Sequence, residues 1–449
     1  MQEIISKTIF WPKPAFFGLN TIMSATIHEK FKQKHILESM MSLIMFQSSS
    51  AQQNFLQTVE LLASTIRGML DAGGLIHKID IDHKKAWSEV KGKKICFVDG
   101  GVANFSGIGA EPIAVRIGTY TVVPGDTSEK RENFNIEKQL VAELFEPHSD
   151  DGVFEDLFED TSKLRDAARI TLEVAAGVHK IKKEPDIDFL VFHGALVNPV
   201  SAYGVSDFPN FSESALHHIL AETKTLPKGI NASFVSVYLN ILNELKSSKI
   251  NIASVVERTS SSKIVSNALL DELNATDLSP GPGDIQAAKK KLAEFRIPDW
   301  ILFQAILNEG EYLQPVTVDR NTESKQPQYS KHIISRYPKP QLTYVGVGEF
   351  APPLRVEFFN EPPAGYDCLL RLIVHSCRLM PQYAFPVGLD IVDKFAKIPQ
   401  WMSSPLNSAL AVSVLKKALD SKDPNLIDAA KKMLCGTKRD FLFRPSFKK

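Results

Sequence analysis

The 449-residue chain lacks the features that would place it at once in several large classes of protein. It has four cysteines, at 96, 368, 377 and 435, and no two of them form a CxxC pair. This spacing argues against a zinc site and fits a reducing compartment. No run of about 18 apolar residues is present, so no membrane-spanning helix is expected. Together these absences predict a cytoplasmic protein.

An excess of one charge is also missing, because 52 Lys and Arg residues balance 52 Asp and Glu residues. Any surface for nucleic acid must therefore come from local clusters of basic residues. A Walker-type phosphate loop is absent as well, so we do not expect this chain to hydrolyse ATP itself. What remains, 44% hydrophobic and 23% charged residues, is an ordinary soluble composition with enough length for one large or several smaller domains.

Apolar periodicity predicts an α/β protein with a mixed sheet, flanked by helices and preceded by a helical region. Alternation between residues 111 and 123 indicates strands with one covered face. The acidic run over 148–160 is typical of a solvated loop or helix surface. The predicted helices lie within 27–70 with a break near Ser48–Ser50, near 136–145, over 161–181 and 232–246, and near 366–379 and 386–399; the predicted strands lie at 94–98, within 111–123, at 189–193, 250–257, 343–347 and 354–359.

Two of the predicted strands end in a polar residue followed by glycine. Residues 93–98 lead into Asp99, Gly100 and Gly101, and residues 189–192 lead into His193 and Gly194. A buried strand that delivers an aspartate to its carboxyl end, beside glycines that let a ligand approach, is typical of metal-dependent phosphoryl transfer. The same pattern also occurs where an ordinary strand enters a turn. The motif therefore marks Asp99 as a candidate metal ligand without deciding between these two interpretations.

A basic, hydroxyl-rich turn, Arg258 to Lys263, follows the predicted strand at 250–257. Its side chains suit phosphate oxygens, and they equally suit the capping of a helix. Arg116 and the basic tail at 438–449 are further candidates for contact with DNA or with a partner protein.

The order of these motifs resembles that of the NurA nucleases. The motifs are Phe97 to Gly101, a helix that carries Glu173, the segment Phe189 to Leu196, and the segment Phe385 to Ala396. The likeness spans roughly residues 90 to 400. It implies an RNase H-like core, cleavage of DNA with Mn²⁺ or Mg²⁺, a homodimer, and action with a HerA-like hexameric DNA-translocating ATPase.

The resemblance assigns roles one residue at a time. Asp99 matches the first metal-binding aspartate of the family, and Glu173 matches the glutamate on the helix before the next strand, with Asp166 as a rival. The family then has Asp-Gly-x-Leu, where this chain has His193-Gly194-Ala195-Leu196. His193 either binds the metal or is a structural histidine in a weakened site. Imidazole is a softer ligand than carboxylate and would bias the site toward Mn²⁺.

A second departure lies near the carboxyl terminus. The family has Tyr-Pro followed by a helix position often filled by histidine, whereas this chain has Phe385-Pro386 and then Asp393. If Asp393 faces the site, it replaces the carboxylate that is missing at position 193, and the two departures form one compensated exchange. If it does not, Asp393 is an exposed helix residue beside Lys394 and Lys397.

These residues together predict the function and its competitors. We expect Asp99, Glu173, His193 and Asp393 to form the catalytic site, with the first three as metal ligands, and Arg258, Lys263 and Arg116 to contact DNA. The predicted protein is a metal-dependent DNA nuclease for end resection or for degradation of foreign DNA, as in repair or antiviral defence. The alternative is a catalytically weakened NurA-like subunit that serves as a DNA clamp or motor regulator. A third alternative, an unrelated α/β protein, predicts that Asp99 and Glu173 lie far apart.

The motifs also suggest a division of the chain. Residues 1–90 are predicted to form a helical N-terminal region, residues 91–400 an RNase H-like nuclease domain with insertions, and residues 401–449 a helical tail.

Overall fold

The protein is described by a computed structural model in which the chain forms two units, Met1–Thr58 and Val59–Lys449. Of the first unit only the start of one helix is described, so the fold below is that of the second. The described residues are 48–104, 113–142, 144, 154–198, 210–220, 233–257, 264–275, 281–318, 335–381 and 383–436.

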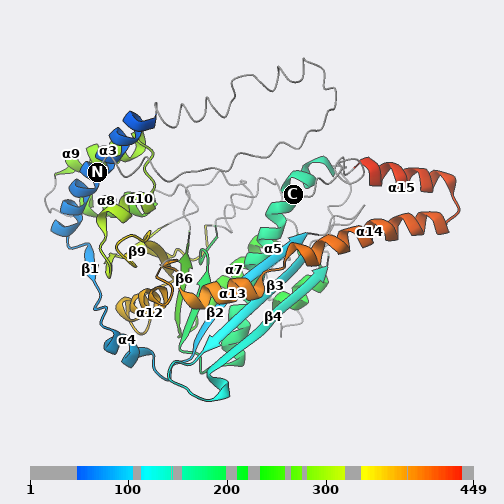
Figure 1. The fold of residues 1–449 in the computed structure, drawn as a ribbon, viewed down its shortest axis with the longest axis horizontal. Coiled ribbons are helices and arrows are strands. Elements are labelled where there is room, and N and C mark those ends of the chain that lie inside the picture. Colours follow the sequence, from blue (N-terminus) through cyan, green and yellow to red (C-terminus); the bar gives the residue numbers. More distant parts are fainter. Residues whose placement is uncertain are drawn as a thin grey trace, which may run out of the picture. The chain divides into compact units, whose positions relative to one another are not determined.

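A ten-stranded mixed sheet forms the centre of the second unit, in the order β1-β7-β9-β10-β6-β5-β2-β3-β4, with β8 paired to β9 (Figure 1). β5 pairs in parallel with both β2 and β6, and every other ladder is antiparallel. The strands are β1 Ile76–Lys78, β2 Ile95–Asn104, β3 Ile113–Val122, β4 Glu132–Ala142, β5 Phe189–His193, β6 Asn251–Val256, β7 Glu311–Leu313, β8 Val316–Thr317, β9 Gln341–Val345 and β10 Leu354–Phe358.

Helices flank this sheet, as the α/β prediction requires, and the fold class is confirmed. They are α3 Ser48–Ala72, α4 His83–Val90, α5 Phe154–Lys183, α6 Glu213–Leu220, α7 Phe234–Lys246, α8 Ile264–Ala275, α9 Pro282–Glu294, α10 Asp299–Ile306, α12 Tyr366–Arg378, α13 Val387–Ala396, α14 Gln400–Asp420 and α15 Pro424–Gly436. The first of the two N-terminal helices predicted within 27–70 lies outside the described residues, and α3 begins at the predicted break.

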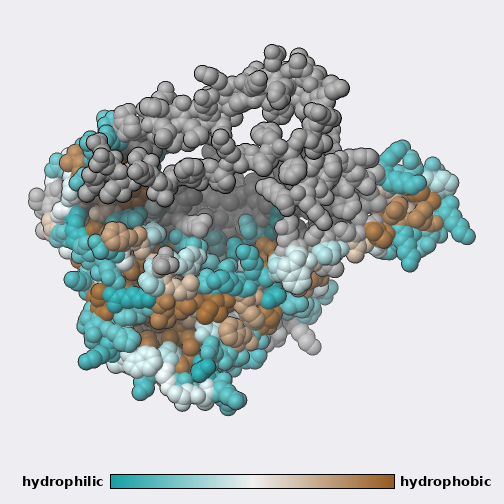
Figure 2. Space-filling view, viewed as in Figure 1, coloured by the Kyte–Doolittle hydropathy of each residue, from teal (hydrophilic) through white to brown (hydrophobic). Residues whose placement is uncertain are grey.

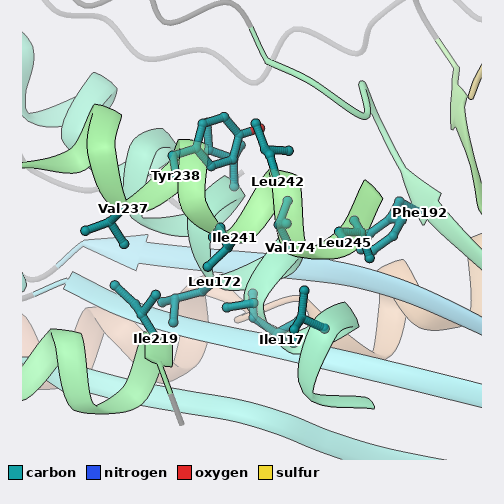
Figure 3. Packing of buried hydrophobic residues seen from close by; sticks show 14 of the residues in the cluster. Ile117, Leu172, Val174, Phe192, Ile219, Val237, Tyr238, Ile241, Leu242 and Leu245 are labelled. Carbon is teal, nitrogen blue, oxygen red and sulfur yellow. The ribbon is translucent and has the colours of Figure 1, made fainter. Parts of the chain in front are cut away.

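Two hydrophobic cores form because successive side chains of a strand point to opposite faces of the sheet. Cys96 and Val98 of β2 belong to the core under α5, α6 and α7, whereas Ile95 and Phe97 belong to the core under α12 and α13. Figure 3 shows the first core, in which Leu172 of α5 lies among side chains from α7, α6 and the sheet. Figure 1 shows α13 lying across β2 and β3 on the other face.

Four details of the sequence prediction were wrong. The two strands expected within 111–123 are one continuous strand, β3. The prediction of one covered face fails because α5 and α13 cover opposite faces of β3, which is buried along nearly its whole length. The strand that was expected to end at Asp99 continues to Asn104, since β2 keeps pairing with β3 after β5 has ended. Residues 132–142, which include most of the helix predicted near 136–145, form β4.

The wrong helix has a local cause. A β-bulge inserts Glu137 between Ile136 and Lys138, which pair with Gly118 and Ile117 of β3. Ile136, Leu140 and Leu144 lie four residues apart, a spacing that fits one face of a helix and also one face of a strand, so the sequence pattern did not decide between them. In the structure the extra residue turns Leu140 to the face opposite to that of Ile136.

The last two helices, α14 and α15, pack on each other. Their surface carries apolar side chains among charged ones (Figure 2), including Val412, Leu419 and Leu426. Among the described residues, no helix combines the length and apolar character needed to cross a membrane.

Candidate active site

The candidate site forms where the parallel part of the sheet ends. β2 and β5 pair from Ile95 and Phe189 to Val98 and Phe192, and the next residue on each strand is Asp99 or His193. Neighbouring parallel strands end at the same edge of a sheet, so the two side chains emerge side by side. The chain turns directly after His193, at Gly194, whose φ of 89° favours glycine.

Three side chains meet at this edge. One ligand atom each from Asp99, His193 and Asp393 lies within 4.8 Å of the other two. Asp393 reaches the edge from α13, and Asp99 is only 4% exposed. The side chain of Asp99 is fixed from two sides, because its Oδ2 lies 2.9 Å from His193 Nδ1 and its Oδ1 accepts a hydrogen bond of 2.8 Å from the backbone N–H of Gly100.

The glycine pair after Asp99 lets two helices approach β2 from opposite faces. A Cβ on Gly100 would lie 2.6 Å from Oε1 of Glu173 on α5. A Cβ on Gly101 would lie 2.3 Å from the carbonyl oxygen of Ala396, at the end of α13. The absence of a side chain at both positions therefore places Glu173 and α13 against the same stretch of backbone.

Glu173 lies beside Gly100 but outside the three-residue group. Its side chain is 7% exposed and forms an ion pair of 2.6 Å with Arg169, four residues earlier on α5. Asp166, the rival candidate, is exposed and contacts Arg169 only at 3.9 Å. Polar side chains spaced four residues apart on a helix usually face solvent. Arg169 and Glu173 instead face the site.

The carboxylates of the site repel one another. Burial raises the pKa of Glu173 to about 7 against the opposing charge of Arg169, and Asp99 adds to the rise. The pKa of Asp393 is also raised, first by burial and then by the charge of Asp99. Closely spaced carboxylates with raised pKa values are the arrangement that a bound cation stabilises, since it removes the repulsion.

The contact with Asp99 determines which ring nitrogen of His193 carries a proton. Burial lowers the pKa of His193, but the hydrogen bond to Asp99 and the charges of Asp99, Asp393 and Glu173 outweigh burial, so that the pKa is raised overall. An ionised carboxylate can only accept hydrogen bonds, so Nδ1 carries the proton that it donates to Asp99. In the neutral imidazole this leaves Nε2 as the nitrogen with a lone pair for a cation.

The predicted DNA contacts are only partly described. Arg258 and Lys263 lie outside the described residues. Arg116, on β3, donates a hydrogen bond to the carbonyl oxygen of Phe395, and its guanidinium lies 5.5 Å from the centre of the Phe395 ring. Arg116 therefore already holds the end of α13 against the sheet, and a phosphate contact by this residue stays a prediction.

The sequence analysis did not identify two residues that hold parts of the site in position. Arg169 pairs with Glu173, and its spacing of four residues was the signal that could have revealed it. Glu357 of β10 is fully buried and accepts a hydrogen bond of 2.9 Å from the N–H of Leu196, in the segment that follows His193. No local signal in the sequence connects residues 196 and 357.

Comparison with known proteins gives one family and a set of solved structures. The family model described as the NurA domain matches residues 93–398, more than half of the chain. No curated protein matches. A crystal structure of the NurA nuclease from Sulfolobus solfataricus is similar to the chain at 12% identity, with 88% of this chain and 98% of that chain covered and a TM-score of 0.48. A crystal structure of NurA bound to dAMP and manganese is similar at 11% identity, with 82% and 94% covered and a TM-score of 0.39.

Proposed function

Because this chain belongs to the NurA family, we propose that it is a divalent-metal-dependent DNA nuclease whose active site is built from Asp99, His193, Asp393 and Glu173. The observation that carries the proposal is the meeting of Asp99, His193 and Asp393 within 4.8 Å at the carboxyl edge of the parallel strands. These groups come from two strands and a helix that lie far apart in the sequence. Their meeting at one point supports a shared site, because an unrelated set of polar residues would have no reason to converge.

The donor set fits a hard divalent cation. Two carboxylates and an imidazole offer oxygen and nitrogen ligands, which suit Mn²⁺ and, with less preference for the imidazole, Mg²⁺. Asp99, His193 and Asp393 would hold the ion. Glu173 lies beside Gly100 and offers a further carboxylate close to these residues. A divalent ion bound there would polarise the scissile phosphate and lower the pKa of an attacking water.

The other residues of the site keep these groups in place. Arg169 keeps Glu173 directed at β2, and Arg116 fixes the end of α13, the helix that carries Asp393. The hydrogen bond from His193 to Asp99 orients both side chains. Asp393 would thereby supply the carboxylate that the family motif has at the position of His193, which supports the compensated exchange.

We extend the proposal to the partners of the enzyme. The substrate is DNA, the chain acts as a homodimer, and a HerA-like hexameric ATPase delivers the DNA, with Arg258 and Lys263 as sequence-independent phosphate contacts. The cleavage would serve end resection in repair or the destruction of foreign DNA, which use the same chemistry.

Cleavage of linear duplex and single-stranded DNA with Mn²⁺, Mg²⁺ or EDTA, with and without a HerA-like ATPase, tests the proposal. We expect metal-dependent cutting by the wild type and its loss in Asp99→Ala and Asp393→Ala. Asp186→Ala is the matched control, because this exposed carboxylate pairs with Lys94 just before β5, at the end of the strand opposite to His193. An Asp393→Ala protein that cuts normally would remove Asp393 from the site. A wild type that binds DNA or the motor but never cuts would support the clamp or regulatory function instead.

A further inference from the structure

Three aromatic rings, those of His193, Phe385 and Tyr383, contact one another in this order between the candidate site and the surface. The ring centroid of Phe385 lies 5.3 Å from that of His193, and the ring of Tyr383 follows at 5.9 Å from Phe385 in an edge-on contact. Phe385 is buried, whereas Tyr383 is 45% exposed. The site residue His193 is thus joined through Phe385 to an aromatic side chain at the surface.

The position of Tyr383 is fixed by its surroundings. Its hydroxyl donates a hydrogen bond of 3.1 Å to Oε1 of Glu257, the residue directly after β6. β6 is the parallel neighbour of β5, and His193 pairs with Val255 in that ladder, so Glu257 lies at the same edge of the sheet as the site. The ring is therefore tied at one end to the site edge and at the other to Phe385.

The backbone around Tyr383 is also specified. The N–H groups of Tyr383 and Ala384 both donate to the carbonyl oxygen of Met380, just after α12. Ala384 adopts a φ of 51°, a left-handed conformation that residues other than glycine rarely take. Strained backbone of this kind persists only where the surroundings enforce it, and it clusters at functional sites. At Ala384 it separates the exposed Tyr383 from the buried Phe385.

We propose that Tyr383 is a stacking platform for an unpaired nucleobase of the DNA strand whose phosphate would contact a metal ion held by Asp99, His193 and Asp393, an inference that rests on the proposed function. An exposed aromatic ring held rigidly beside a phosphate-binding centre is the arrangement with which proteins bind single strands. Bases inside a duplex already stack on their neighbours, so the platform selects a single strand or a frayed end. Because every base has an aromatic face, it does so without reading the sequence.

Binding of a single-stranded oligodeoxynucleotide with a cleavage-resistant phosphorothioate backbone tests the platform in Mn²⁺, where an ion can occupy the site while the strand stays uncut. Fluorescence anisotropy would compare wild type with Tyr383→Ala, Tyr383→Phe and Trp87→Ala. Trp87 is a matched control, since it is 42% exposed and lies beside Gly125, in the turn that follows β3 and adjoins the start of β2, away from Asp99. A second set of oligodeoxynucleotides lacks one base at successive positions but keeps every phosphate.

We expect Tyr383→Ala to weaken binding by about 5- to 150-fold, the range found when a stacking aromatic is truncated. Tyr383→Phe keeps the ring and should retain most of the affinity, and Trp87→Ala should bind as the wild type does. Removal of the stacked base should weaken binding by the wild type and have no further effect on Tyr383→Ala. The dependence of affinity on salt should stay unchanged in Tyr383→Ala, because no phosphate contact is lost.

The outcomes separate the platform from the nuclease. If Tyr383→Ala binds as tightly as the wild type, or loses as much affinity as the wild type on removal of each base, the platform is refuted even where metal-dependent cutting is lost in Asp99→Ala. If binding depends on Tyr383 but the wild type never cuts with any metal, the platform stands and the nuclease proposal fails. A wild type that binds no single strand refutes the platform outright.

Discussion

Replacement of Gly101 by alanine tests how closely α13 must approach β2. The added Cβ would lie 2.3 Å from the carbonyl oxygen of Ala396 and 2.9 Å from its carbonyl carbon and from the Cα of Lys397. All three are backbone atoms, so no side-chain rotation relieves the clash and the end of α13 must shift. Overpacking of this kind costs about 1–3 kcal/mol. Because Asp393 lies on the last turn of α13, the shift also separates its carboxylate from Asp99 and His193.

Urea denaturation and the DNA cleavage assay measure the two consequences of Gly101→Ala. We expect the free energy of unfolding to fall by about 1–3 kcal/mol with an unchanged m-value, and metal-dependent cutting to fall with it. Gly68→Ala is the control, because a Cβ on Gly68 meets nothing within 4 Å in an exposed part of α3. There the same substitution should stabilise the protein by about 0.5–1 kcal/mol, as alanine does in helices. A Gly101→Ala protein of wild-type stability and activity would refute the close approach of α13 to β2.

Three further predictions concern other parts of the fold. Burial raises the pKa of Asp299 to about 6, above its unfolded value near 3.9, so the folded state binds the proton more tightly than the unfolded state. The free energy of unfolding should therefore fall by up to about 3 kcal/mol as the pH rises from 4 to 6. Urea titrations at both pH values should show this fall in the wild type and not in Asp299→Asn. Burial raises the pKa of the Cys96 thiol to about 12, so iodoacetamide should modify the partly exposed Cys368 in the native protein and leave Cys96 unmodified in mass spectra. Arg116→Met should lower the free energy of unfolding by about 2 kcal/mol, since a charged hydrogen bond and a cation–π contact with Phe395 are lost; a drop of one in the salt slope of DNA binding at unchanged stability would instead make Arg116 a phosphate ligand.

Parts of the fold could be predicted because their information is local. The apolar runs that precede Asp99 and His193 become buried strands, and both residues lie at the ends of those runs, as expected from strand periodicity. α5 carries Glu173 on the predicted helix before β5. β4 could not be predicted, because the spacing of Ile136, Leu140 and Leu144 fits a helix as well as a strand, and only the pairing with β3 decides between them.

The sequence by itself determined the set of polar residues placed at strand and helix ends and the two glycines that leave room beside Asp99. Only the tertiary structure decided which of these residues share a site. The parallel pairing of β2 with β5 puts Asp99 beside His193, and the packing of α13 on β2 and β3 adds Asp393 from almost three hundred residues away. The packing of α5 against β2 places the ion pair of Arg169 and Glu173 beside the site, where the sequence alone indicated only an ordinary pair on a helix surface. Side-chain chemistry is written in the sequence, whereas proximity depends on long-range packing, which no local pattern encodes.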